Sequence, residues 1–365
     1  MNREPNQDLR LQPRINPEML ILARESRGLT QSELAKMLGV SQGFVSKTES
    51  GLLEPTLDMV TKLGGLLEYP VTFFQLADPI YGPGVTEFWH RKRQAATARQ
   101  MRRVYAEINK RIIHVNRLLR AADLPESFQR FDLDEFDGPA DVARAVRTAW
   151  NLPQGPVRDV MDAMEGAGGI VIRCDFGTRL VDAVSRWVPG MPPLFFLSEG
   201  LPADRERLTL AHELGHIVMH RTPSPTMEEE AFEFAGEFLT PEREIAPYLT
   251  HLTLPRLASL KSMWRVSMGA LITRASRLDL IAPRQARYLW MQMGRAGYRE
   301  REPAELDFPR EEPRILKELF EIHRDALGYS LEDLASLFAI HPEEITRTYS
   351  VEPTSTEARR QLHAI

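Results

Sequence analysis

One stretch near the middle of the chain decides how its larger part is built: Thr209-Leu210-Ala211-His212-Glu213-Leu214-Gly215-His216. Its apolar flanks favour a packed helix, on which residues four apart lie one turn apart on the same face. His212 and His216 can then reach a single metal ion. Glu213 lies beside them and could take a proton from a metal-bound water. The pattern predicts a zinc site of the hydrolase type.

Two histidines do not complete such a site, because a catalytic zinc usually has three protein ligands. Residues 227–239 form a second helical pattern, and its small and apolar residues mark a buried face. Glu228 lies on that face and is the predicted third ligand, whereas Glu230 lies on a different face and is the alternative. His220, two turns after His212, is expected to have a core or surface role. The competing interpretation is a pair of core histidines held by salt bridges.

Helix signals also follow one another closely near the start of the chain, between residues 16 and 78. Thr30 and Glu33 have the spacing of a capping box. Gly39 suits the left-handed end of that helix, and Ser41 can cap the next one. Two short helices joined by a glycine-containing turn predict a helix-turn-helix.

This part resembles the Xre/lambda-repressor family, in the runs Leu29–Ala35 and Val40–Gly51. The resemblance implies that Gln31 meets a DNA phosphate at the start of the second helix. Glutamine can pair with adenine and lysine with guanine or phosphate, which agrees with a DNA reader. A bundle used only for dimerisation or partner docking is the alternative. The residues implied to face the major groove are Gln42, Gly43, Ser46 and Lys47.

Residues 140–300 resemble the ImmA/IrrE family of metallopeptidases. The matching runs are Asp204–His216, Glu228–Pro241 and Leu260–Arg274. The resemblance implies a gluzincin-like zinc site and, in some relatives, cleavage of a repressor partner. Thr240 stands where the family often has Met and Gly236 where it often has Ala, but neither is a proposed ligand.

The expected fold class is α+β and mostly helical. It comprises a helix-turn-helix bundle, a helical metal domain with a small sheet and a helical C-terminal region. Apolar runs predict strands at 168–173, 181–187 and 194–198. Residues 1–15 are polar and are expected to form a flexible arm.

Two further segments flank the metal domain. A basic helical connector is expected over 85–125, because residues 89–120 carry ten Lys or Arg against one acidic residue. It could follow DNA phosphates, or it could be a solvated face paired with acidic residues. Residues 313–350 echo the helix-turn-helix, but Glu343 and Glu344 would repel phosphate, so packing or dimerisation is favoured over DNA reading.

The overall composition indicates the cellular compartment in which the protein functions. With 365 residues, 27% of them charged, a net charge of −5 and a single cysteine, it is typical of a cytoplasmic protein without disulfides. It has no apolar run long enough for a membrane span. Any DNA affinity must come from a local basic surface.

The function expected is a DNA-binding transcriptional regulator with a zinc-dependent metallopeptidase domain. It would control a stress, prophage or toxin–antitoxin type operon, and proteolysis of a repressor or toxin is one way in which it could do so. It would bind a double-stranded operator as a homodimer, and it would hold Zn²⁺. The alternative is an antitoxin or repressor whose metal pocket is structural or ligand-sensing. Glu213 favours catalysis, because a ligand-only site has no need of it.

Overall fold

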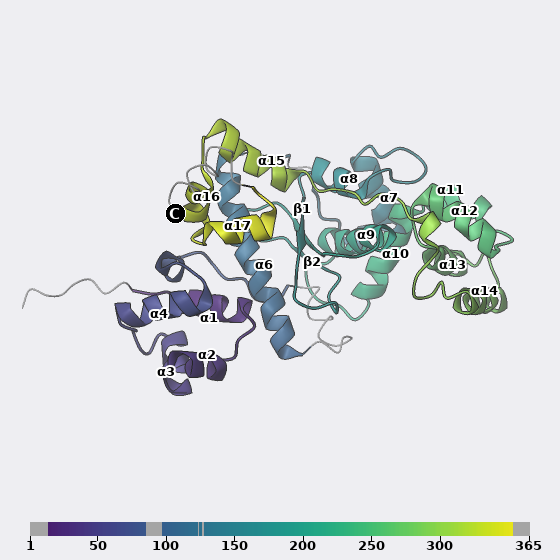
Figure 1. Cartoon of the computed structure of the whole chain (residues 1–365). Coiled ribbons are helices and arrows are strands. Elements are labelled where there is room, and N and C mark those ends of the chain that lie inside the picture. Colours follow the sequence, from purple (N-terminus) through teal and green to yellow (C-terminus); the bar gives the residue numbers. More distant parts are fainter. Residues whose placement is uncertain (1–13, 85–96, 123, 126–127, 353–365) are drawn as a thin grey trace, which may run out of the picture.

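The computed structural model describes residues 14–84, 97–122, 124–125 and 128–352. The expected N-terminal arm therefore lies almost entirely outside the described residues. The described part is mostly helical with one three-stranded sheet, which confirms the expected fold class (Figure 1). The main elements are α1 (Pro17–Ser26), α2 (Gln31–Leu38), α3 (Gln42–Glu49), α4 (Leu57–Leu67), α6 (Ala98–Leu118), α7 (Pro139–Ala149), α8 (Val160–Gly166), β1 (Ile170–Cys174), β2 (Ala183–Arg186), β3 (Leu194–Ser198), α9 (Ala203–Met219), α10 (Met227–Leu239), α11 (Glu242–Ile245), α12 (Leu254–Trp264), α13 (Met268–Arg277), α14 (Pro283–Arg295), α15 (Ile315–Glu321), α16 (Leu331–Phe338) and α17 (Pro342–Tyr349).

Capping residues determine where the helices of the N-terminal bundle begin and end. Thr30 and Glu33 make the predicted capping box at the start of α2, and Gly39 ends that helix with φ 70°. Ser41 then accepts a hydrogen bond from the Phe44 amide and starts α3. After Pro70 the chain forms a short 3₁₀ turn, Val71–Gln75, whose two phenylalanines are buried.

The sheet separates two hydrophobic cores. β3 is central, with β1 parallel on one side and β2 antiparallel on the other. Successive side chains of a strand point to opposite faces. Accordingly, Leu194 and Phe196 pack in one core with α6, whereas Phe195 and Leu197 pack in the other with α9. This second core fixes α9, and therefore the His-Glu-x-x-His stretch, against the sheet.

Residues 98–118 of the predicted basic connector form the long helix α6, which runs through the middle of the molecule (Figure 1). The N-terminal bundle packs against it, and the C-terminal helices α15 and α16 also contact it. α16 and α17 form the expected second helix-turn-helix-like pair, with a capping box at Ser330. Glu344 of α17 is buried and faces α6, which favours the packing role expected for this unit.

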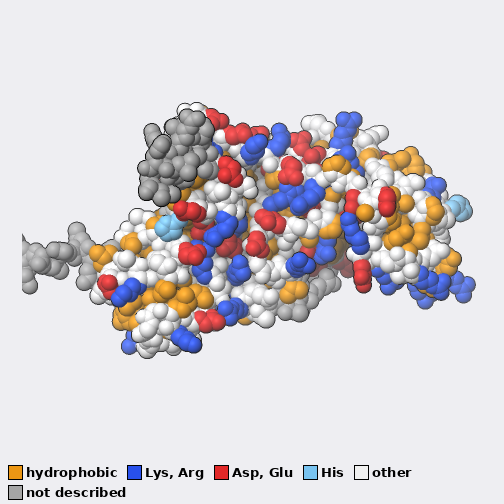
Figure 2. Space-filling model, in the orientation of Figure 1, with side chains coloured by type: hydrophobic (Ala, Val, Ile, Leu, Met, Phe, Trp, Pro, Cys, Tyr) orange, Lys and Arg blue, Asp and Glu red, His pale blue; other side chains and the backbone are white. Residues whose placement is uncertain are grey.

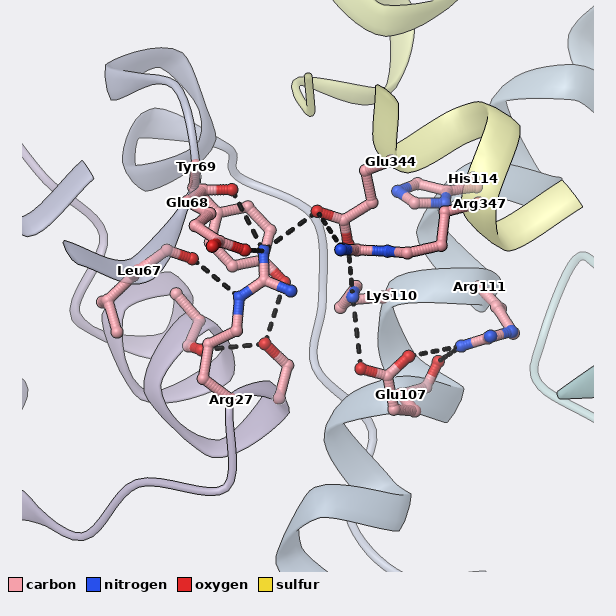
Figure 3. A network of polar contacts seen from close by, with 12 residues as sticks. Arg27, Leu67, Glu68, Tyr69, Glu107, Lys110, Arg111, His114, Glu344 and Arg347 are labelled. Atoms are coloured by element: carbon pink, nitrogen blue, oxygen red, sulfur yellow. Dashed lines mark hydrogen bonds and ion pairs between the residues drawn. The ribbon is translucent and has the colours of Figure 1, made fainter. Parts of the chain in front are cut away.

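A buried polar cluster joins the three parts of this assembly (Figure 3). The Glu344 carboxylate accepts hydrogen bonds from Lys110 Nζ at 2.8 Å and from Arg27 Nη2 at 3.0 Å. Lys110 also donates to Glu107 at 3.2 Å, and Arg111 donates to the same carboxylate at 2.6 Å. Burial tends to raise the pKa of both carboxylates, but the neighbouring cations more than offset this effect, so each pKa lies below its ordinary value.

Three more basic residues of α6 are also paired within the protein. Arg99 donates to Glu33 at 3.0 Å, Arg102 lies 3.5 Å from Glu25, and Arg117 donates to an aspartate before the helix. Figure 2 shows the same interleaving of basic and acidic side chains across the middle of one face. This favours the paired-helix alternative over a phosphate-binding track. The basic run at 91–93 lies outside the described residues.

Candidate functional site

α9 and α10 bring the three predicted metal ligands together. α10 follows α9 after a short turn and packs back against it. The two helices approach closely at Gly215, where an added Cβ would lie 3.0 Å from the ring of Phe234. This close packing places Glu228, in the first turn of α10, opposite His212 and His216 of α9.

The donor atoms have the spacing that zinc requires. The Nε2 atoms of His212 and His216 are 3.0 Å apart, and Glu228 oxygens lie 3.3 Å from His216 Nε2 and 3.8 Å from His212 Nε2. Tetrahedral zinc with bonds of roughly 2.0–2.1 Å needs donors about 3.3 Å apart. Two imidazoles and one carboxylate are also a usual donor set of catalytic zinc. The residues present therefore fit the metal expected from the sequence.

Glu213 is buried beside these ligands and is held by a residue that the sequence did not single out. Its Oε2 accepts a hydrogen bond from Ser185 Oγ at 2.5 Å. Ser185 belongs to β2, an outer strand of the sheet. The Glu213 carboxylate is therefore tied to β2.

Glu230, the alternative ligand on another face of α10, contacts His220. Its Oε2 lies 3.0 Å from Nε2 of His220, and it does not belong to the group of converging donors. His220 directly follows α9, so it lies beside the first turn of α10, where side chains on more than one face can reach it. His220 Nδ1 lies 2.9 Å from His216 Nδ1. Burial, together with the His216 ring, lowers the pKa of His220 to about 4.

A cavity begins next to the metal site. The ring of Phe232 is 40% exposed and lies 4.2 Å from the ring of His212, centroid to centroid. Phe232 also lines a cavity of about 500 Å³ between α9, α10, α13 and α14. Its walls include apolar residues such as Leu208 and Trp290 and several arginines.

The residues predicted to contact DNA lie on α2 and α3. Glu49 is buried and bound by Arg24, with Nε–Oε1 at 2.5 Å. The other Glu49 oxygen accepts from Gln31 at 2.8 Å, and Gln31 in turn accepts from Gln42 at 2.7 Å. This series of hydrogen bonds fixes the side-chain amides of Gln31 and Gln42 at the surface where α2 and α3 meet. The remaining predicted residues lie along α3, with Gly43 and Lys47 exposed and Ser46 half-buried.

Two family models match the chain. Residues 20–74 match the helix-turn-helix family, and residues 165–276 match the IrrE N-terminal-like domain family. The chain joins an Xre-like helix-turn-helix domain to an ImmA/IrrE-type domain. The ImmA/IrrE-type domain contains α9, α10 and all three candidate ligands. Both matched ranges lie inside the segments expected from the sequence, whose outer bounds stay predictions. No curated protein matches the chain.

None of the helices in the described ranges has the length and apolarity that a membrane span requires.

The sequence analysis did not identify Ser185 or the contact between His220 and Glu230. Ser185 gave no signal, because it lies 28 residues before its partner and comes from a different element. His220 did have a signal in the sequence, because it follows His216 by four residues, the same spacing that identified the ligand pair.

Proposed function

We propose that this chain is a DNA-binding transcriptional regulator whose ImmA/IrrE-type domain is a zinc-dependent metallopeptidase. The observation that carries this proposal is the convergence of His212, His216 and Glu228 within zinc-binding distance, with Glu213 buried next to them. A purely structural zinc site is normally closed by four protein ligands. Among the described residues only three donors meet here, which leaves one coordination position for water or substrate.

The ligands, Glu213 and Ser185 would each have a separate role in peptide hydrolysis. Zinc held by the three ligands would act as a Lewis acid on a peptide carbonyl and would activate a water molecule. Glu213 would accept the proton released and pass it to the leaving amine. Ser185 would orient the Glu213 carboxylate through its hydrogen bond. The cavity beginning at Phe232 offers apolar surface to a polypeptide next to the reacting bond.

The helix-turn-helix would bring this activity to DNA. Gln31 would contact a phosphate, and Gln42, Gly43, Ser46 and Lys47 would face the major groove of an operator. One such domain buries little surface on DNA, so a homodimer on a two-fold operator is the proposed binding form. The substrate would be a protein encoded with the operon, such as a repressor or toxin, in a stress, prophage or toxin–antitoxin setting.

The test compares wild type with Glu213→Gln in the native host. Protein N-termini are mapped by mass spectrometry, and promoter occupancy is followed by chromatin immunoprecipitation. Glutamine keeps the size of the side chain but cannot accept the proton, so specific N-termini should disappear while zinc content is retained. If both strains give the same set of N-termini and the same occupancy, the peptidase proposal is wrong.

A second candidate function is a regulator, or antitoxin, whose metal pocket senses a ligand. The cavity that adjoins Phe232 favours it, since about 500 Å³ can hold a small molecule. This alternative predicts that Glu213→Gln leaves cleavage products unchanged, whereas filling the cavity at Ala235 with Trp changes promoter occupancy.

A further inference from the structure

Three side chains form a continuous polar chain that ends at the metal site. Glu230 Oε2 lies 3.0 Å from His220 Nε2, and His220 Nδ1 lies 2.9 Å from His216 Nδ1. The opposite nitrogen of His216, Nε2, faces Glu228 and His212. His216 and His220 are nearly completely buried.

The chemistry of these groups fixes where each proton lies. An ionised carboxylate only accepts hydrogen bonds, so the Nε2 of His220 must donate to Glu230. The Nδ1 of a neutral His220 ring is then an acceptor, and the proton between the two rings must belong to His216 Nδ1. When a metal ion lies between His216 Nε2 and the Glu228 oxygen 3.3 Å away, His216 presents its lone pair to that ion.

The same assignment follows from the metal side. A histidine that binds a metal through Nε2 carries its proton on Nδ1 and donates it to a partner. Here the partner is a second histidine, which is itself held by a carboxylate. The carboxylate end and the metal end of this polar chain therefore require the same tautomer of His216.

The geometry points to His220 and Glu230 as positioning residues that hold His216 in its metal-binding tautomer and orientation. This inference rests on the proposed metal centre. His220 is not itself a ligand, because its Nδ1 contacts the far side of the His216 ring and it does not belong to the group of converging donors.

Two variants of nearly equal size separate this role from simple packing. His220→Asn places an oxygen acceptor where Nδ1 stood, whereas His220→Leu offers no acceptor. Glu230→Gln removes the charge at the end of the chain. Glu229→Gln is the matched control, since Glu229 lies next to Glu230 on α10 and is exposed.

The first measurement uses the full-length chain loaded with zinc and labelled with ¹⁵N-histidine, and it reads the hydrogen bond of the His216 Nδ1 proton by NMR. This proton should give a downfield resonance that exchanges slowly in wild type, in His220→Asn and in Glu229→Gln. In His220→Leu it should lose its acceptor, move upfield and exchange faster. An unchanged His216 Nδ1 proton in His220→Leu overturns the inference.

The second measurement is zinc affinity against a competing chelator, with the cobalt-substituted protein as a spectroscopic check. Loss of an outer partner of this kind typically weakens metal binding by about 10–100-fold. His220→Leu should show a loss of this size, His220→Asn should recover most of it, and Glu229→Gln should bind like wild type.

Other outcomes have distinct meanings. If His220→Leu keeps wild-type affinity, the positioning role is wrong and the metal centre stands. If His220→Leu changes the cobalt spectrum to that of a site with fewer nitrogen donors, His220 is a ligand and the positioning role is again wrong. If wild type takes up no zinc at all, the proposed metal centre fails, and the positioning role fails with it.

Discussion

Glu344 should hold the C-terminal helix α17 onto the central helix α6, and its removal gives a measurable test of the junction in Figure 3. Its side chain is 5% exposed and binds Lys110, whose side chain is 4% exposed, at 2.8 Å. Removing one partner of a buried ion pair costs about 3–5 kcal/mol. Lys110 retains Glu107, and Arg27 retains hydrogen bonds to backbone carbonyls, so the lower end of this range applies.

The variant is Glu344→Gln, and the assay is hydrogen exchange of the α17 amides by mass spectrometry. A loss of about 3 kcal/mol in the free energy of opening corresponds to exchange roughly 150-fold faster, at 1.36 kcal/mol per tenfold. Glu343→Gln is the control, because Glu343 is the neighbouring carboxylate and is exposed. Lys110→Met should have less effect in the Glu344→Gln background than alone, since both changes remove the same contact.

Two results would refute this reasoning. Exchange in Glu344→Gln within about threefold of wild type would mean that the buried pair contributes less than about 0.7 kcal/mol to holding α17. Equal effects of Glu344→Gln and Glu343→Gln would mean that the loss reflects net charge and not the buried contact.

Three further predictions concern packing, DNA and pH. Gly215→Ala places a Cβ 3.0 Å from Phe234, and this overpacking should lower the free energy of unfolding by about 1–3 kcal/mol, read as a lower Tm. Lys47→Gln should weaken binding to nonspecific duplex DNA and reduce the slope of log K against log salt by about 1, and an unchanged slope would remove Lys47 from the interface. Since the pKa values of Glu107 and Glu344 are lowered in the folded chain, their contribution to stability is complete above the unfolded pKa of about 4.3 and is lost at lower pH. The Tm difference between wild type and Glu344→Gln should therefore shrink between about pH 5 and pH 3, and a constant difference would contradict the assignment.

Local signals in the sequence were sufficient for the helices and for the candidate ligands. The capping box at Thr30 and the histidine spacing on α9 depend on residues within one or two turns, and local sequence determines such features. The spacing of His212 and His216 predicted that they share a face. The choice of Glu228 also depended on a periodic pattern within a single helix.

The remaining features depend on contacts between distant segments. Lys110 donates to Glu344, which lies 234 residues later in the sequence, so this charge of the basic helix is paired inside the protein and does not meet DNA phosphates. The contact of Glu230 with His220 could not be predicted, because helix periodicity describes one helix and not the end of the neighbouring one. Ser185 could be identified only once the sheet had placed β2 beside α9.

The central claim is that His212, His216 and Glu228 hold one zinc ion. The most direct measurement is the zinc content of purified full-length protein after equilibration with zinc, for wild type, His212→Ala and Glu228→Gln. We expect one zinc per chain in wild type, and little in either variant at a zinc concentration near the wild-type Kd. A folded wild-type chain that takes up no zinc, or a His212→Ala variant that still holds one ion per chain, would contradict the account.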